Sequence, residues 1–525
     1  MGVVQNAIDG LVETFAPERG ARRAMARQQM AVIRQTGYSN YGASTTKNSL
    51  RGWLYSGGDA KADIEDNLDI LRQRSRDAYM GVPLAASAIK TMRTHVVGSG
   101  LVPKPQIDST LLHITPQAAE QLQEQITREF GIWANSANCD AARIDNFYQL
   151  QQLAFLSYAM NGDVLALLPM KQRPGWPYSL TVQLIEADRL CNPHFAESTQ
   201  PRIVQGVELD SSGEAVAYHI CNIHPLATSK NAPDGTPMTW QRIPAYGKAS
   251  GRRNVLHVMT RERVGQVRGV PMLAPVLDAI KSMGRYLDAE QQAALVNALW
   301  VVYITKDAPA DNVKPGQFVA PQQQIAPDDE KALELGSGTV WDLNPGEKPE
   351  AIDPKHPTGN FGNFMDSLTK QIGAALETPA EVLEKSFNSN YSAARGAFNE
   401  FWQTVEMQRD WLVDDFCQTM YEEWLAEAVA LGRISAPGFF DDPAVRAAYC
   451  RCEWSGPAQI QIDPVKEVTA AKMRVENCFS TAEKETAALC GGSYAANIRQ
   501  RKIEEMQKKE VYGNGEQNQN PAGAQ

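Results

Sequence analysis

The clearest pattern of apolar and polar positions runs from residue 361 to residue 432. Apolar residues recur at three- and four-residue spacing from Phe361 to Leu376 and again from Ser392 to Leu431, which is typical of helices with one apolar face. Pro379 separates the two helices, because the residue before a proline is excluded from helical geometry. Gly432 is placed to end the second helix. At a rise of ~1.5 Å per residue, the second helix has a predicted length of roughly 60 Å.

This long helix is rich in large apolar residues and in acids. Between residues 400 and 427 the only base is Arg409, whereas the acids are Glu400, Glu406, Asp410, Asp414, Asp415, Glu422, Glu423 and Glu427. A solvated acidic face is one interpretation. The other is a set of identical helices packed around an axis, with an acidic lining. In that case we expect Trp402, Trp411 and Trp424 at the contact between subunits, because one domain cannot bury so long a helix.

Helical patterns dominate the start of the chain, and strand patterns follow. Helices are predicted over residues 63–79, 83–97, 116–134 and 146–160, and strands over 164–168, 180–185, 203–209, 215–220 and 255–259. The polar run Asp210 to Gly213 predicts a hairpin turn. Helices first and a mostly antiparallel sheet afterwards indicate an α+β fold.

A small proline-rich segment lies between two predicted helices. Pro271 opens a helix that is predicted to reach Trp300, and the β-branched and aromatic residues 301–304 predict a strand directly after it. A second strand-like piece spans Thr339 to Leu343, among prolines at 309, 315, 321, 327, 345, 349, 354 and 357. A helix that leads away from the body, a small β module and a helix that returns to the body together predict a projecting arm.

The end of the chain is predicted to be helical and then disordered. Helices are expected at residues 464–477, 481–489 and 494–509, whereas the tail 513–525 is polar and lacks large apolar residues.

Composition excludes several classes of protein. With 43% hydrophobic and 21% charged residues, the 525-residue chain is an ordinary globular protein. Its net charge of −10 argues against non-specific DNA binding over the whole surface. The longest apolar run, Ala293 to Ile304, is too short to span a bilayer. We expect no secretory signal, and the eight scattered cysteines favour reduced thiols in a cytoplasm.

Catalytic motifs are weak or missing. Gly247-Lys248 suggests a P-loop, but Arg242 stands where the first glycine belongs and Ala249 stands where Ser or Thr should bind magnesium. Neither HExxH nor GxSxG occurs in the sequence. We therefore expect no enzyme activity and no cofactor.

One pattern leaves a metal site open. Two Cys-x-x-His pairs could hold zinc tetrahedrally, as in a zinc-dependent hydrolase; they are Cys191 with His194 and Cys221 with His224. Such residues also come together by chance in a sheet region, so the pattern is only a weak candidate.

Short motifs occur in a characteristic order between residues 60 and 510. They are Pro83 to Ile89, Val97 to Leu101, Gly162-Asp163, Ile185 to Leu190, Val267 to Pro271, Leu343 to Glu347 and Asn390 to Arg395. Each is unspecific alone, but the ordered set resembles the portal proteins of tailed bacteriophages, specifically the lambda-type family.

The resemblance implies a dodecameric ring at one vertex of the viral head, through which DNA is packaged and later ejected. It implies a virion protein that is assembled in the host bacterial cytoplasm. Its implied partners are identical subunits, the large terminase subunit, a head–tail adaptor, the major capsid or scaffold protein and double-stranded DNA, with no membrane. Another ring-forming adaptor of the virion is the alternative, which chain length and the two-helix arm disfavour.

The resemblance also assigns a role to each part of the chain. The parts are a wing (1–270, with an N-terminal arm at 1–60), stem helices (271–300 and 359–377), a clip (301–358), a tunnel loop (378–391), a tunnel helix (392–432), a wing return (433–464), a crown (465–512) and a disordered tail (513–525). In the tunnel loop the residues expected to face the DNA are Glu381, Glu384, Lys385, Asn388 and Asn390. Lys385, the only base of this loop, would offer one phosphate contact per subunit.

Overall fold

The computed structural model describes residues 25, 43–44, 47–50, 52–53, 57–196, 202–298, 302–306, 347–351, 361–386, 391–459 and 463–512. The chain separates into two compact units, residues 1–59 and 60–525. The described part of the first unit contains one short 3₁₀ helix, η2 (Asn48–Leu50). The elements that follow belong to the second unit.

The second unit begins with helices in the predicted regions, but the single helix predicted over residues 63–79 is divided into three shorter ones. The helices of this part are α3 (Ala60–Asp63), η3 (Glu65–Asn67), α4 (Leu68–Gly81), α5 (Pro83–Val96), α6 (Pro116–Ala134) and α7 (Phe147–Asn161). Local capping explains two of the starts. Thr115 accepts a hydrogen bond from the backbone N–H of Ala118 before α6, and Asn146 and Gln149 form a reciprocal capping box at α7.

Two antiparallel sheets follow, with strand orders β3-β2-β8 and β4-β5-β6-β7. The strands are β2 (Asp163–Leu167), β3 (Gln183–Glu186), β4 (Arg202–Val204), β5 (Val207–Leu209), β6 (Ala215–Cys221), β7 (Trp240–Pro244) and β8 (Val255–Met259). Residues 203–209, predicted as one strand, form a hairpin instead, because Gln205 and Gly206 adopt positive φ and turn the chain. Short 3₁₀ helices lie nearby: η4 (Ala137–Cys139), η5 (Ala187–Arg189) and η6 (Pro193–Phe195).

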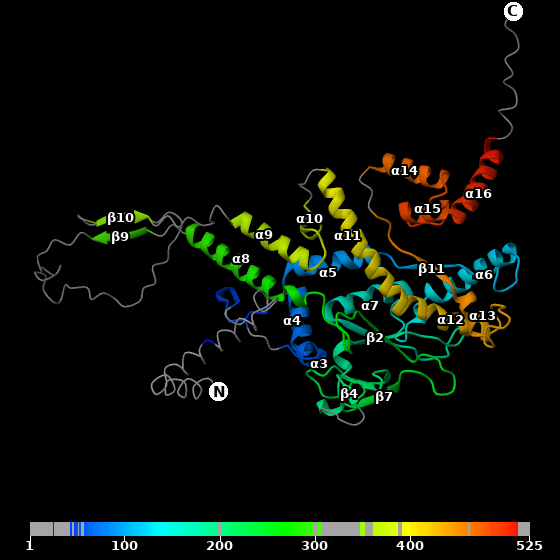
Figure 1. Cartoon of the computed structure of the whole chain (residues 1–525), viewed down its shortest axis with the longest axis horizontal. Coiled ribbons are helices and arrows are strands. Elements are labelled where there is room, and N and C mark those ends of the chain that lie inside the picture. The colour runs from blue at the N-terminus through cyan, green and yellow to red at the C-terminus, as the bar shows by residue number, and fades with distance from the viewer. Residues whose placement is uncertain are drawn as a thin grey trace, which may run out of the picture. The chain divides into compact units, whose positions relative to one another are not determined.

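The three-stranded sheet is the middle layer of this region (Figure 1). Successive side chains of a strand point to opposite faces. Val164 and Ala166 of β2 therefore join the large core that contains α7, whereas Leu165 joins a smaller core shared with the four-stranded sheet. A separate two-stranded pair joins β1 (Val102–Pro105) to β11 (Cys452–Ser455).

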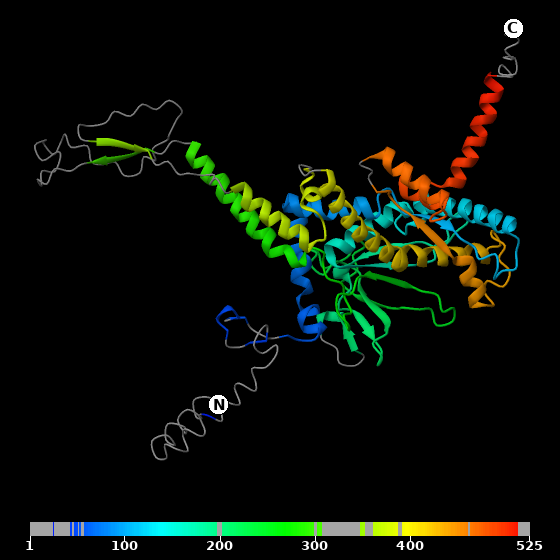
Figure 2. The ribbon, with the colours of Figure 1, turned by 45° about the horizontal axis from the view of Figure 1, so that its top comes forward.

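Helices α8 (Leu277–Ala298) and α9 (Phe361–Ala375) lie side by side (Figure 2). The ring of Tyr286 contacts those of Phe361 and Phe364, with centroids 5.6 and 4.9 Å apart. α8 begins later than predicted, after the 3₁₀ helix η7 (Ala274–Val276). Between the two helices in sequence lie β9 (Val302–Lys306) and β10 (Glu347–Ala351), which pair antiparallel. The predicted strand at 339–343 lies outside the described residues.

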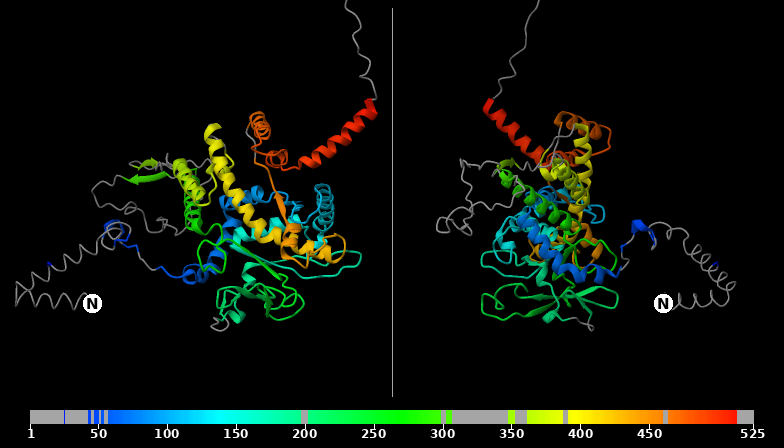
Figure 3. Two further views of the ribbon diagram at one scale, coloured as in Figure 1. Left: turned by 45° about the vertical axis from the view of Figure 1, so that its right-hand side comes forward. Right: turned by 90° about the vertical axis from the view of Figure 1, so that its left-hand side faces the viewer.

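The predicted long helix is present from residue 391 to residue 430. It consists of α11 (Tyr391–Leu412), a π-helical segment η8 (Val413–Gln418) and α12 (Thr419–Ala430). The helix changes direction near the π-helical segment (Figure 3), a common cause of helix bending. Gly432 follows with a φ of 69°, the left-handed conformation that commonly ends a helix.

The remaining helices are α10 (Ala380–Glu384), α13 (Pro443–Cys450), α14 (Pro464–Glu476), α15 (Ala482–Cys490) and α16 (Tyr494–Tyr512). The last three confirm the predicted C-terminal helices, and the tail 513–525 lies outside the described residues. Among the helices that the structure describes, none is long and apolar enough to cross a membrane.

Candidate functional site

The exposed side of α11 is the strongest candidate for a functional surface. It carries Glu400, Glu406 and Asp410, and Asp414 continues it at the start of the π-helical segment. We call these four residues the acidic face. Partial burial, and then the charge of Asp414, raise the pKa of Asp410. Like charges one turn apart repel one another, so the acidic face does not stabilise the isolated chain.

The one base in this stretch, Arg409, lies close enough to act electrostatically on Glu406 and Asp410, but it directs its hydrogen bonds elsewhere. The guanidinium of Arg409 donates to the carbonyl oxygens of His95 (2.8 Å), Val96 (3.0 Å) and Pro457 (3.0 Å). It also lies 5.4 Å from the ring centroid of Trp402. Arg409 is therefore engaged within its own chain, and the acidic face keeps its negative charge.

The three tryptophans of the long helix lie in different surroundings. Trp424 has no exposed surface and packs edge-on against Phe130 of α6. This burial leaves no surface for the subunit contact predicted for Trp424, because its own domain already covers it. Trp411 is 41% exposed, and half-buried Trp402 donates its indole N–H to Glu406 (2.9 Å). At roughly 100° per residue, Trp402 and Trp411 lie about 180° apart around α11, on the two flanks of the acidic face.

The acids of α12 are held within the chain. Glu423 pairs with Arg252 at 2.7 Å. Glu427 accepts hydrogen bonds from the backbone N–H groups of Ser179 (2.6 Å) and Leu180 (3.0 Å). The exposed acids of the long helix are thus confined to α11 and the π-helical segment, a narrower distribution than the composition of the helix predicts.

The predicted tunnel loop contains the short helix α10, which packs onto the core. Val382 and Leu383 are buried, and the hydroxyl of Ser87 donates to the carbonyl oxygen of Leu383 (2.7 Å). Buried Thr378 precedes α10. The first part of the segment is therefore anchored to α5.

The predicted DNA-facing residues of this segment are placed unequally. Glu384 and Lys385 are exposed at the end of α10, where Lys385 adopts a φ of 55° and closes the helix. Glu381 is partly buried. Asn388 and Asn390 lie outside the described residues.

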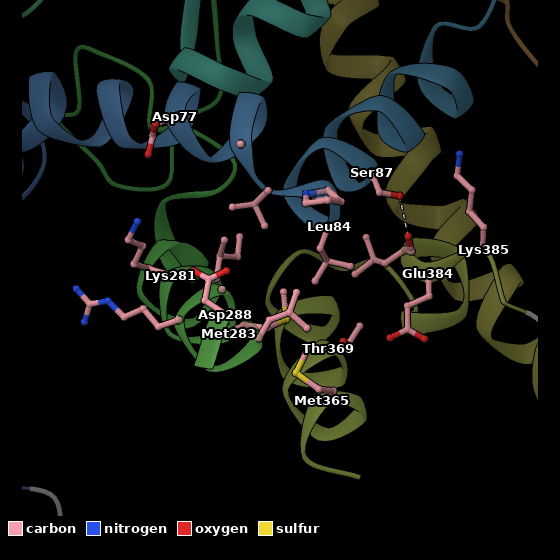
Figure 4. Close-up of a pocket in the computed structure, with 18 residues that line it drawn as sticks. Asp77, Leu84, Ser87, Lys281, Met283, Asp288, Met365, Thr369, Glu384 and Lys385 are labelled. Atoms are coloured by element: carbon pink, nitrogen blue, oxygen red, sulfur yellow. Dashed lines mark hydrogen bonds between the residues drawn. The ribbon is translucent and has the colours of Figure 1, made fainter. Parts of the chain in front are cut away.

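A groove of about 820 Å³ opens beside the start of α8 (Figure 4). Leu84 of α5, Met283 and Leu287 of α8 and Met365 of α9 form its apolar floor. Charged side chains of both signs also line it: Asp77, Lys281, Arg285, Asp288, Glu384 and Lys385. Because these charges cancel, the groove does not suit a polyanion such as DNA.

A buried charge centre, which no pattern in the sequence predicts, lies where the motifs Gly162-Asp163, Ile185 to Leu190 and Val267 to Pro271 meet. Asp163 accepts from Arg268 (2.6 Å), from Arg72 (3.2 Å) and from His257 (3.1 Å, if that ring nitrogen carries the proton). Burial alone would raise the pKa of Asp163, but Arg268 and Arg72 hold it well below its usual range. Gly162, Asp163 and Arg268 belong to motifs of the ordered set, whereas no motif contains Arg72 and nothing in the sequence predicts its role.

The charge centre fixes the chain just before α8. Arg268 also donates to the carbonyl oxygens of Ala187 and Leu190 (2.8 and 2.7 Å). Beside it, Gly162 and Gly269 touch through their backbones, since a Cβ on Gly269 would lie 1.9 Å from the Gly162 carbonyl oxygen. The start of the α8–α9 arm is thereby held against the three-stranded sheet.

The four residues of the weak zinc candidate do not form one site. Cys191 accepts from the indole N–H of Trp240 (3.2 Å), and the His194 ring packs against the same tryptophan. In the described part of the chain, the group of His, Cys, Asp and Glu that could hold a metal ion is Glu186, Asp188 and His224; neither Cys191 nor Cys221 belongs to it.

That group is already occupied by a cation of the chain. Arg76 forms ion pairs with both Glu186 and Asp188. Burial would raise the pKa of Asp188, but its hydrogen bond with Arg76 lowers it. A guanidinium between the two carboxylates competes with a metal ion, so the structure does not support the zinc alternative.

Comparisons with known proteins agree over most of the chain. Residues 46–409 match the family model described as phage portal protein, lambda family. The chain is 24% identical over 496 residues to portal protein B of Escherichia phage lambda, covering 90% of each chain. It is also 24% identical over 497 residues to the portal protein of Escherichia phage N15, covering 90% and 91%.

A solved structure gives a more distant likeness. The neck of a native gene transfer agent particle, computed with C12 symmetry, contains a chain that is 13% identical, with a TM-score of 0.42 over 81% of this chain and 93% of that chain. The family match, by contrast, spans well over half of the sequence. The chain therefore belongs to the lambda family of phage portal proteins, the structural components of the virion that connect head and tail at one vertex of the capsid.

Proposed function

We propose that twelve copies of this chain form a ring around a DNA channel and that the acidic face of α11 is directed towards the DNA. The observation that carries this proposal is a row of four exposed acids on one side of the helix, whose neighbouring base Arg409 donates its hydrogen bonds to backbone carbonyl oxygens. Basic surfaces bind DNA by releasing counterions and would retain it, whereas an acidic surface lets a polyanion pass.

The same arrangement gives each flank of α11 a neighbour. A closed ring requires two different contact surfaces on every subunit. Trp402 and Trp411 lie on opposite flanks of the acidic face, so each is available to a different adjacent subunit. Trp424 is not part of this proposal.

Images of the purified full-length protein in negative stain test the ring. We expect large rings with a central hole. Replacing Glu406 and Asp410 by lysine should leave the rings intact but slow DNA packaging and ejection, whereas Glu120→Lys, at an exposed position of α6, should affect neither. A protein that remains monomeric contradicts the ring, and normal DNA passage in the Glu406 and Asp410 variant contradicts the acidic lining.

We also propose that residues 301–358 bind the large terminase subunit during packaging and a head–tail adaptor afterwards, while capsid or scaffold protein surrounds the ring. The segment lies in sequence between α8 and α9 and includes the β9–β10 pair. Deletion of residues 309–327 should preserve rings and abolish terminase binding in a pull-down assay. Undiminished binding would place the docking site elsewhere.

A further inference from the structure

A glycine lines the groove beside α8 at a position where no contact among the described residues requires a glycine. Gly284 stands within α8 and lines the groove, and a Cβ at this position would meet no atom within 4 Å. Glycine weakens a helix relative to alanine, so alanine would fit and would strengthen the isolated chain. A glycine at such a place permits close approach of another backbone.

The exposed charges of α8 and α9 are also unexplained. Asp278, Lys281 and Arg285 on α8 and Asp366 and Lys370 on α9 are all exposed. Within the described residues, none of them forms an ion pair or a side-chain hydrogen bond. Charges around an apolar patch are the usual composition of a protein interface, with an apolar centre and a polar rim.

Ring symmetry predicts which residues of adjacent copies meet. Rotation about the ring axis does not change the position of any residue along that axis. For arms that run along the axis, the helices of adjacent arms therefore have the same register along the axis as α8 and α9 of one chain. Tyr286 lies level with Phe361 and Phe364. On the antiparallel α9, Phe364 is then level with Gly284, and Asp366 lies within about one turn of Lys281 and Arg285.

We propose that the groove binds the α9 helix of a neighbouring copy of this chain. Phe364, which is 49% exposed, packs against Gly284 and the apolar floor of the next subunit. Asp366 pairs with Lys281 and Arg285 across the contact. By the same register, Lys370 comes level with Asp278. This contact rests on the proposed ring and adds to it a second subunit interface, at the arm.

Two charge-reversed chains that complement each other test the contact. One carries Lys281→Glu with Arg285→Glu, and the other carries Asp366→Lys. Each alone places like charges at every contact and should raise the concentration needed for half-assembly by about tenfold. An equal mixture should assemble like the parent in alternating order, because both contacts then join opposite charges. Lys248→Glu, on the exposed turn between β7 and β8, is the control and should have no effect.

Analytical ultracentrifugation and native mass spectrometry separate the outcomes. Recovery of assembly in the mixture alone supports the contact. Assembly of either variant at the parent's concentration overturns the contact and assigns the groove to another occupant, such as another virion protein. A mixture no better than its components also overturns it. If the parent protein forms rings, the proposed function stands whatever the variants do. If the parent protein forms no rings, the proposed function itself is contradicted.

Gly284→Ala gives a second, independent test. It should raise the melting temperature of the unassembled chain and weaken assembly several-fold, because the added methyl group separates the two helices. Gly131→Ala in α6 should raise the melting temperature without changing assembly. Assembly of Gly284→Ala that equals or exceeds the parent's would contradict a helix packed at this position.

Discussion

The two halves of the long helix contain similar residues and use them differently. In α12, Trp424 is fully buried and Glu423 and Glu427 are bonded to other parts of the chain. In α11, Trp411 is 41% exposed, and the neighbouring base Arg409 donates its hydrogen bonds to backbone carbonyl oxygens rather than to the acidic face. The second half thus belongs to the core of one chain, whereas the first half is open to contacts outside it.

The difference lies in what each half packs against. α6 and the segment before β3 cover α12. The donors for its acids are the backbone N–H groups of Ser179 and Leu180 in that segment and the guanidinium of Arg252 before β8. The outward side of α11 has no such cover among the described residues. Composition therefore predicts that acids and aromatic residues are present, while only the surrounding elements decide whether they stabilise one chain or an assembly.

The largest contrast is expected between two tryptophans. Trp424→Ala should lower the free energy of unfolding by about 3–5 kcal/mol, because it leaves a cavity in a closed core. Trp411→Ala should cost less than about 1 kcal/mol in the unassembled chain and instead weaken ring assembly. Urea unfolding below the assembly concentration measures the first effect, and sedimentation measures the second. Equal losses of stability would contradict the division of the helix.

A smaller contrast is expected between two glutamates. Glu427→Ala should cost about 1–3 kcal/mol, because the backbone N–H groups of Ser179 and Leu180 lose their acceptor. Glu400→Ala on the acidic face should change the free energy of unfolding by less than about 0.5 kcal/mol. If urea unfolding gives both variants the parent's stability, the carboxylate of Glu427 does not hold α12 in place.

A pH dependence should distinguish the acidic face from the buried acids. A raised pKa means that the ionised form of Asp410 is disfavoured in the folded chain, so its charge costs stability above that pKa and the cost disappears as pH falls through it. Asp410→Asn should therefore stabilise the chain by about 0.2–0.5 kcal/mol at neutral pH and by nothing in acid. A stabilisation that persists in acid would exclude charge repulsion as its cause.

The smallest effect on the chain is expected at Lys385. Because it is exposed, Lys385→Glu should leave the free energy of unfolding and ring assembly unchanged. If the segment after α10 faces the channel, the variant should retain packaged DNA less well. The loss should shrink at high salt, since exposed charges are screened over a Debye length of ~8 Å at physiological ionic strength. Normal retention at low salt would remove Lys385 from the channel.

Elements with local signals were predictable from the sequence. The helices α5, α6 and α7 carry their own start signals in Pro83, Thr115 and Asn146. β7 and the β1–β11 pair were missed, because Val102 pairs with Ser455 across most of the chain. A strand of that kind depends on a distant partner rather than on its own residues.

The candidate sites were predictable to different degrees. The acids of α11 are evident from the sequence, but the internal pairing of the α12 acids is not, because Arg252 and Ser179 are remote in the chain. The charge centre joins Arg72 to Asp163 over 91 residues, which no local pattern reveals. The groove at Gly284 combines several helices and has no signature in any one of them.

The π-helical segment Val413–Gln418 determines the phase between α11 and α12. A π-helical turn accommodates one residue more than an α-helical turn. Each added residue rotates everything beyond it by roughly 100° about the helix axis. Deleting a single residue from this segment would turn the acids of α11 towards the interior or carry Trp424 out of it, with almost no change in composition. The separation of an exposed acidic face from a core-forming half is thus encoded in spacing, and an insertion or deletion here would be more damaging than most substitutions nearby.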